Sequence, residues 1–153
     1  KHVQQFNKEG HLRWDSLGEF LALAVSLDFI GEKDNNSNAY LLGKTLDDAT
    51  TSFLMNNRSP SRKVGELDNR GSHFYLALYW AEELSKQNEN QTLKAVFSSF
   101  YEKMKANEAS IIEELNNAQG SVVDINGYYN PDERLTSLQM RPSKTLNEII
   151  DSI

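Results

Sequence analysis

One stretch of the sequence gathers side chains suited to holding an anion. From Ser59 to Ser72 the residues SPSRKVGELDNRGS place three cations, three serines and two glycines within fourteen positions. Arginine offers a planar fork of donors that matches phosphate oxygens, lysine adds a point charge, and hydroxyls and glycine-flanked amides add donors. The stretch also fits a solvated loop between helices in which Arg70 pairs with Asp68 or Glu66. The GxxxxGK[ST] spacing of a P-loop is absent.

A second group of such residues lies near the N-terminus and consists of His2, His11, Arg13, Trp14 and Asp15. These residues precede the first predicted helix, which begins after Ser16. The free amides and the positive dipole end at its start favour a phosphate. Trp14 beside Arg13 suits an adenine ring through stacking and cation–π contact. The alternative is that Trp14 is a core anchor at the helix start while Arg13 is exposed. The histidines have no acidic or cysteine partners that complete a ligand set, so no metal site is predicted.

No further group of residues indicates catalysis. The aromatic side chains between positions 74 and 80 recur at helical spacing, which is typical of a core. Neighbouring carboxylates such as Asp47 and Asp48 point in different directions on a helix, so they form a solvated face. No Ser-His-Asp arrangement with a nucleophile elbow is present. We therefore assign no catalytic residue to this chain.

Helices must position the two candidate groups, because helical periodicity runs through nearly every segment. One predicted helix covers Ile111 to Leu115 and ends near Gly120, and the others begin after Ser16, Ser37, Ser72, Asn90 and Ser143. The helix after Ser16 is expected to end before Gly31. Residues 122–125 could form a strand, but no partner strand is visible. Asn130 and Pro131 indicate a turn or the start of a short helix. The predicted fold is mainly α, a helical array of about six helices with at most one short strand, in a single segment over residues 1–153.

The composition supports a single globular domain and excludes several functions. The chain has 153 residues, of which 39% are hydrophobic. No apolar run approaches the roughly 20 residues that span a bilayer, and a net charge of −6 disfavours binding to nucleic acid or anionic lipid. The absence of cysteine excludes a thiolate metal site and suits a reducing compartment.

Several longer motifs resemble one enzyme family, the monomeric NADP-dependent isocitrate dehydrogenases, in their C-terminal part. The motifs are LRWDSLGEF from Leu12, SPSRK from Ser59, GELDNRGS from Gly65, FYLALYWA from Phe74, GYY from Gly127 and MRPS from Met140. The similarity covers essentially the whole chain. It implies a fragment of a larger α/β enzyme, and this accounts for a sequence that opens on Lys1 rather than Met.

The resemblance implies an enzyme that oxidises isocitrate and decarboxylates it to 2-oxoglutarate, with NADP⁺ as hydride acceptor and Mg²⁺ or Mn²⁺ on the substrate. It further implies a monomeric cytoplasmic enzyme of the tricarboxylic acid cycle and glyoxylate bypass. It places His2, Arg13 and Arg62 at the adenosine 2′-phosphate, Asp15 near the ribose and Trp14 near the adenine. This assignment agrees with chemistry, because a phosphate favours guanidinium donors whereas a bare 2′-hydroxyl favours a carboxylate.

The resemblance also implies that much of the active site lies outside this chain. The metal ligands and most substrate contacts would precede Lys1, so no metal-binding residue is assigned here and the chain alone is expected to be inactive. Its partners would be isocitrate, NADP and the remainder of the same polypeptide. An isolated piece of this kind is expected to expose apolar surface, with disorder near residues 1–11 or self-association.

Two other functions remain open on sequence grounds. The first is a stand-alone helical interaction module that binds an acidic partner through the loop from Ser59 to Ser72. The second is a regulatory domain that binds a nucleotide without any dehydrogenase partner.

Overall fold

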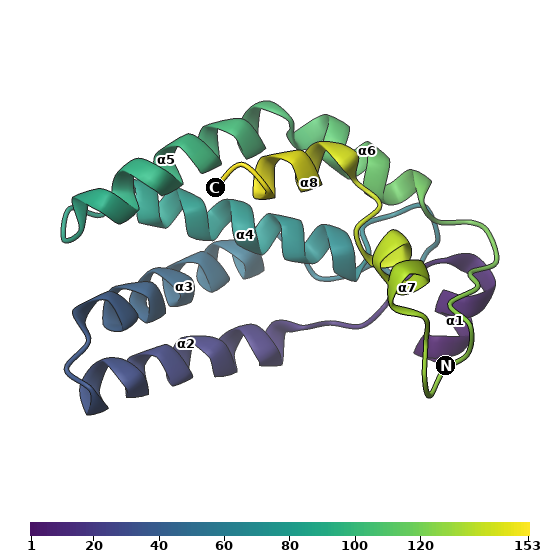
Figure 1. The fold of residues 1–153 in the computed structure, drawn as a ribbon, viewed down its shortest axis with the longest axis horizontal. Coiled ribbons are helices and arrows are strands. Elements are labelled where there is room, and N and C mark those ends of the chain that lie inside the picture. The colour runs from purple at the N-terminus through teal and green to yellow at the C-terminus, as the bar shows by residue number, and fades with distance from the viewer. The chain divides into compact units, whose positions relative to one another are not determined.

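The computed structural model describes all 153 residues and contains eight α-helices and no strand. The helices are α1 (His2–Glu9), α2 (Leu17–Lys33), α3 (Ser37–Met55), α4 (Asn69–Lys86), α5 (Gln91–Ala106), α6 (Glu108–Asn117), α7 (Glu133–Met140) and α8 (Lys144–Ile150) (Figure 1). The mainly α fold is therefore confirmed. Helix α1 adds to the expected helices, and α7 is the short helix that was one of two options after Asn130 and Pro131. None of the helices has both the length and the apolar character needed to cross a membrane.

The chain divides into two compact units. Unit 1 consists of residues 1–15, 59–72 and 107–152, and unit 2 consists of residues 16–58 and 73–106 together with residue 153. All five predicted site residues belong to unit 1. Unit 2 contains α2, α3, most of α4, and α5.

In unit 2, α2 and α3 pack side by side across a short turn (Figure 1). Their buried core side chains, joined by one from α4, are Phe20, Ala24, Leu46, Phe53 and Leu76. The helices approach closely at Gly43, where an added Cβ would lie 3.1 Å from the Ala24 carbonyl oxygen and would also meet the Asp28 carboxylate. A side chain at position 43 would therefore push the helices apart.

The expectation that α2 ends before Gly31 is wrong, because the helix continues to Lys33. A Cβ at Gly31 would lie 2.9 Å from the backbone nitrogen of Tyr40 on α3. Glycine is therefore required here by the close approach of a neighbouring helix and does not end α2. Leu21 of the same helix has the spacing from Phe20 and Ala24 that predicts a buried position, but it is 42% exposed.

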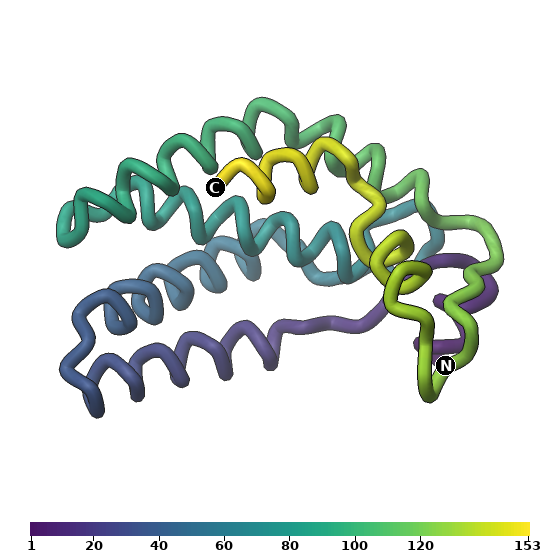
Figure 2. Tube along the Cα trace, in the orientation of Figure 1, coloured from purple at the N-terminus to yellow at the C-terminus, as the bar shows by residue number.

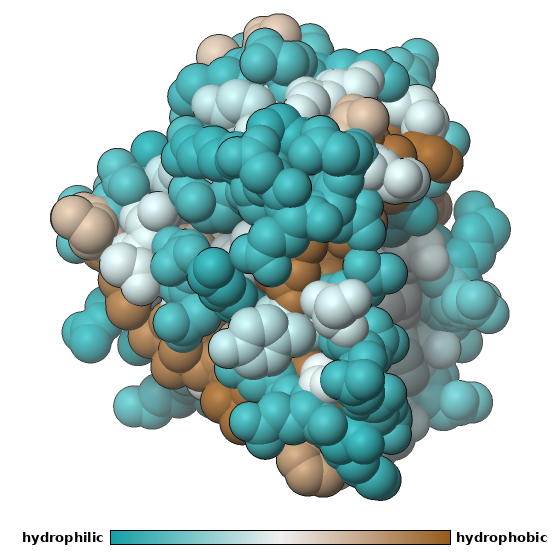
Figure 3. Space-filling model, turned by 90° about the vertical axis from the view of Figure 1, so that its left-hand side faces the viewer, coloured by the Kyte–Doolittle hydropathy of each residue, from teal (hydrophilic) through white to brown (hydrophobic).

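Helix α2 exposes several large apolar side chains, namely Leu21, Leu23, Val25, Phe29 and Ile30. Figure 3 shows apolar surface, in brown, low in the view, at the height where α2 lies in Figure 1. An apolar surface of this kind marks a site of interaction.

Two predicted helix starts are confirmed by their caps. The Asn90 side chain accepts a hydrogen bond from the backbone amide three residues further on at 2.9 Å, and the Ser143 hydroxyl does the same at 3.0 Å. Each side chain thereby satisfies one of the free amides at a helix N-terminus. Ser16 does precede α2, but its side chain makes no capping hydrogen bond.

Two other predicted starts are wrong by one and by four residues. Asn36, rather than Ser37, caps α3 and accepts hydrogen bonds from two backbone amides at 3.1 Å. The helix assigned to a cap at Ser72 begins at Asn69, because the Asp68 carboxylate accepts a hydrogen bond from the amide two residues further on at 2.9 Å. Asp, Asn and Ser are about equally good caps by residue type. Asp68 and Asn36 act as the caps here because each lies where the chain first turns helical.

In unit 1, α1 lies beside the irregular segment that follows α6 (Figure 2). The Gly120 amide donates to the Glu9 carbonyl at 2.7 Å, and the Val123 amide donates to the Asn7 carbonyl at 2.9 Å. Gly120 has a left-handed conformation, with φ 93°, but α6 already ends at Asn117. Gly120 therefore directs the chain toward α1 and does not cap α6.

Glu114 of α6 holds the start of α8. Its carboxylate accepts hydrogen bonds from the Ser143 hydroxyl at 2.6 Å and from the Thr145 hydroxyl at 2.7 Å. Desolvation raises the pKa of Glu114, but these hydrogen bonds and the charge of Lys144 outweigh it and hold the pKa below its usual 4.5. The ionised carboxylate therefore stabilises the folded state above the usual pKa, and this contribution is lost as the pH falls through the lowered value.

We expect Glu114→Gln to lower the thermal unfolding midpoint at about pH 7 and to lessen the fall of that midpoint on going to about pH 4. The amide cannot carry the charge whose loss drives the acid dependence. The neighbouring Glu113→Gln, at an exposed position, is the matched control. Equal acid dependence in the two variants would contradict the assignment.

Candidate functional site

The structure brings the five predicted site residues together around one cavity. The cavity has a volume of about 340 Å³ and is lined by His2, Arg13, Trp14, Asp15, Pro60 and Arg62. The segment before α2 and the loop after α3 thus meet within unit 1. His11, which the sequence placed in the same group, does not line this cavity.

The cavity is cationic at two points. Arg13 is partly buried and Arg62 is exposed, and neither guanidinium forms an ion pair with a carboxylate of the chain. The adjacent Lys63 ammonium instead lies 3.7 Å from the Glu66 carboxylate. Two guanidinium groups without counter-ions at one cavity form an arrangement that favours an anionic ligand.

Trp14 is 53% exposed, so the alternative that it anchors the core is wrong. The His2 ring stands edge-on to it, with 6.0 Å between ring centroids and 79° between planes. The backbone at Trp14 is fixed, because its carbonyl accepts a hydrogen bond from the Asn69 side chain at 2.8 Å. The indole is therefore an exposed aromatic surface on a fixed support.

A second cavity of about 310 Å³ shares His2, Arg13 and Trp14 with the first, and its other lining side chains are mainly apolar. These are Val3, Phe6, Asn7, Leu12, Ile125 and Tyr128. A cationic cavity and an apolar one thus meet at the same indole. Such a pair suits a ligand with a charged group next to a planar apolar ring.

The loop that carries Arg62 is held in a fixed shape. The Ser61 amide donates to the Leu67 carbonyl at 2.7 Å, and the Ser61 hydroxyl donates to the Glu66 carboxylate. The Arg62 carbonyl accepts a hydrogen bond from the Gln5 side chain on α1 at 3.3 Å. The loop is therefore an ordered support for the Arg62 guanidinium.

Unit 1 contains an ion pair that the sequence offered as one alternative. The Arg70 guanidinium, with its side chain only 2% exposed, lies 2.6 Å from the buried Asp68 carboxylate. It also donates to the carbonyls of Gly10 and Gln139, while Asp68 accepts from the Leu12 amide at 3.2 Å. The pairing of Arg70 with Asp68 is confirmed. Of the three cations in this loop, Arg70 is therefore structural.

Sequence reasoning missed one buried polar cluster, in which His11 contacts Gln119 and Ser61. The His11 ring is fully buried, with Nδ1 2.6 Å from Gln119 Oε1 and Nε2 2.9 Å from the Ser61 carbonyl oxygen. Nothing in the local sequence indicates these contacts, because the partners lie 108 and 50 residues further along the chain. No group of three or more His, Asp or Glu residues in the chain is arranged to hold a metal ion.

The fold and the cavity define a helical protein with a cationic site beside an exposed indole. Over residues 1–151 the chain matches the family described as monomeric isocitrate dehydrogenase, and it belongs to that family. The alternatives of an interaction module and of a regulatory domain outside this family are not supported.

Individual relatives are similar along the whole chain. It is 57% identical over 153 residues to isocitrate dehydrogenase (NADP) 2 of Psychrobacter sp. (strain 13A) and 54% identical over 153 residues to that of Mycobacterium tuberculosis. It is 58% identical over 147 residues to isocitrate dehydrogenase (NADP) of Azotobacter vinelandii. The alignments cover 96–100% of this chain but only 20–21% of the relatives, so the chain spans about a fifth of their length.

Proposed function

We propose that this chain is the C-terminal part of an NADP⁺-dependent isocitrate dehydrogenase and forms the 2′-phosphate side of its coenzyme site. The full enzyme would transfer a hydride from isocitrate to NADP⁺ and release carbon dioxide to leave 2-oxoglutarate. The proposal is supported by the family of the chain and by the names of its relatives. The observation that carries it is the convergence of Arg13 and Arg62 on one cavity.

Each lining residue takes a role that its chemistry permits. Arg13 and Arg62, with His2, bind the 2′-phosphate, because guanidinium groups donate paired hydrogen bonds to phosphate oxygens. Asp15 accepts a hydrogen bond from a ribose hydroxyl, and Trp14 offers its exposed face to the adenine. Selection of NADP⁺ over NAD⁺ follows, because only NADP⁺ carries the group that neutralises both arginines.

The remaining chemistry falls to the rest of the polypeptide. We propose that the ligands of an Mg²⁺ or Mn²⁺ ion bound with isocitrate lie outside this chain, in which no group of three or more His, Asp or Glu residues is placed to hold one. We propose that this polypeptide works as a monomer in the cytoplasm, in the tricarboxylic acid cycle and glyoxylate bypass. We also propose that its remainder packs on the exposed apolar side chains of α2, while the isolated chain is inactive.

The proposed selectivity is tested by titrating the full-length enzyme with NADP⁺, NAD⁺ and 2′,5′-ADP in a calorimeter. We expect 2′,5′-ADP to compete with NADP⁺, and NAD⁺ to bind at least about a hundredfold more weakly, because two charge-assisted contacts are lost. Equal affinity for NADP⁺ and NAD⁺ would show that this chain does not recognise the 2′-phosphate.

A further inference from the structure

We propose that His11 is held as an imidazolium cation and is a positioning residue that joins the two segments carrying Arg13 and Arg62. The inference rests on the proposed function for its ligand, but its first step concerns the protein alone. His11 is fully buried, and each of its ring nitrogens lies within hydrogen-bond distance of an oxygen. If neither oxygen can donate a hydrogen bond, both ring nitrogens must carry a proton and the ring is positively charged.

The oxygen of Gln119 that faces His11 is fixed by the other hydrogen bonds of this amide. Gln119 Oε1 accepts from the Gly65 amide at 2.8 Å, and Gln119 Nε2 donates to the Glu66 carbonyl at 2.9 Å. Rotating the amide by half a turn would place a donor against the Gly65 amide and an acceptor against the Glu66 carbonyl. The flip would break two hydrogen bonds, so the atom at 2.6 Å from His11 Nδ1 is the oxygen.

The second nitrogen faces a group that can only accept, because the Ser61 atom at 2.9 Å from His11 Nε2 is a backbone carbonyl oxygen. Neutral imidazole carries one N–H and would leave one of these contacts as a repulsion between two lone pairs. Both nitrogens therefore donate, which requires the imidazolium. The short 2.6 Å contact agrees with a charged donor.

The contacts of His11 connect both arginine-bearing segments. The Ser61 carbonyl belongs to the peptide group that leads into Arg62, so the hydrogen bond from His11 orients the start of that residue. His11 itself precedes Arg13 by two residues. The residues on either side of it are held in turn, because Arg70 donates to the Gly10 carbonyl and the Leu12 amide donates to Asp68. The imidazolium thereby holds together the two backbone segments that carry the guanidinium groups.

Neutron diffraction from deuterated crystals of the full-length enzyme tests the charge directly. We expect deuterium on both Nδ1 and Nε2 of His11. Deuterium on only one of the two nitrogens would overturn the proposed charge. This measurement uses the unaltered protein, so it does not depend on any variant folding or on binding of a nucleotide.

The positioning role is tested with His11→Gln in the full-length enzyme, with His73→Gln at an exposed position as the matched control. Glutamine can reach one acceptor but cannot donate to both. We expect the KM for NADP⁺ to rise about tenfold, the scale on which misplaced binding groups lose effect, with kcat and the KM for isocitrate changed less than about twofold. The control should change none of these.

The same contact is also tested by changing Gln119, which is partly exposed. Gln119→Ala removes the acceptor at Nδ1, and we expect the KM for NADP⁺ to rise in the same direction while kcat is kept. Unchanged KM values for NADP⁺ in both variants, with raised values in Arg13→Ala and Arg62→Ala, would overturn the positioning role and leave the proposed function intact. Unchanged values in the two arginine variants would instead overturn the proposed function.

Discussion

Arg62→Ala in the full-length enzyme is expected to raise the KM for NADP⁺ by roughly 10- to 100-fold, and Arg13→Ala should do the same. A hydrogen bond to a charged group contributes about 1.5–3 kcal/mol, and each 1.4 kcal/mol corresponds to a factor of ten. Neither guanidinium has a carboxylate partner in the chain, so its removal leaves no buried charge behind. The KM for isocitrate should change less than about twofold. Steady-state kinetics with each substrate varied in turn measures both constants.

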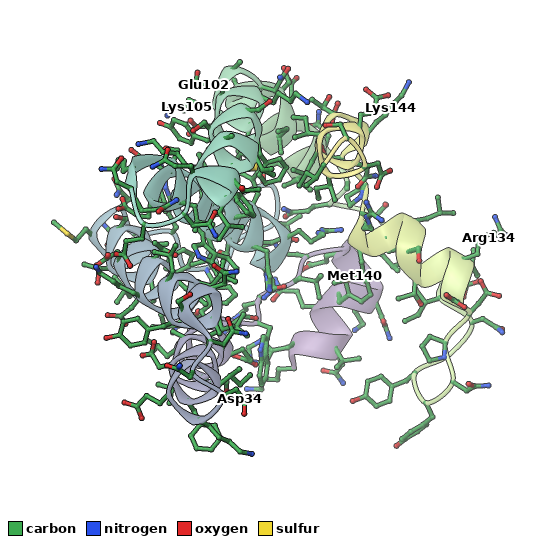
Figure 4. All side chains as sticks on the ribbon, turned by 60° about the vertical axis from the view of Figure 1, so that its left-hand side comes forward. Asp34, Glu102, Lys105, Arg134, Met140 and Lys144 are labelled. Atoms are coloured by element: carbon green, nitrogen blue, oxygen red, sulfur yellow. The ribbon has the colours of Figure 1, made fainter.

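Arg134→Ala is the matched control for these variants. Figure 4 shows Arg134 projecting from α7, and it is not among the residues that line the cationic cavity. The control removes the same charge from the same unit and should leave both KM values unchanged. Unaltered affinity for NADP⁺ in both cavity variants would refute the assignment of the 2′-phosphate to this cavity.

Asp68→Asn is expected to lower the free energy of unfolding by about 3–5 kcal/mol, because it leaves the Arg70 guanidinium buried without a counter-charge. Asparagine is as good an N-cap as aspartate, so the variant removes the charge while keeping an oxygen for the start of α4. Urea-induced unfolding of the full-length enzyme, followed by tryptophan fluorescence, measures the change.

The comparison is with an exposed ion pair in the same unit. The Lys144 ammonium lies 3.7 Å from the Glu148 carboxylate. Lys144, labelled in Figure 4, is exposed on α8. Lys144→Ala should therefore change the free energy of unfolding by less than about 1 kcal/mol. Similar losses in Asp68→Asn and Lys144→Ala would mean that the buried pair contributes no more than a surface pair.

The helices that sequence analysis predicts outright share a stripe of apolar residues. It misses α1 and allows either a turn or a short helix at α7, and both of these helices lack such a stripe. In α1 only Phe6 is buried, and α7 buries no side chain at all. Periodicity detects burial, so helices that bury almost nothing leave no pattern. Gly31 failed as a stop signal for a different reason. Its role is set by Tyr40 on a neighbouring helix, which no local pattern contains.

The candidate site was predictable in part. The chemistry of Arg13, Trp14 and Arg62 is local and visible in residue types, whereas their assignment to a coenzyme came from likeness to a family. The structural roles of His11 and Arg70 depend on partners that are distant in the chain. Arg70 donates to a carbonyl 69 residues further on, and the sequence contains no sign of that contact.

Unit 1 is built from three separate stretches of the chain, so its parts are synthesised at different times. Its pocket depends on contacts that close loops of 50 and 108 residues, from His11 to Ser61 and to Gln119. The entropic cost of closing a loop rises with its length, and distant contacts form late. A nascent chain that already carries both arginines therefore still lacks the support beneath them. We expect the coenzyme to stabilise unit 1 only after most of that unit has left the ribosome. During an early pause in translation the pocket is not yet formed, so the nucleotide cannot bind to it.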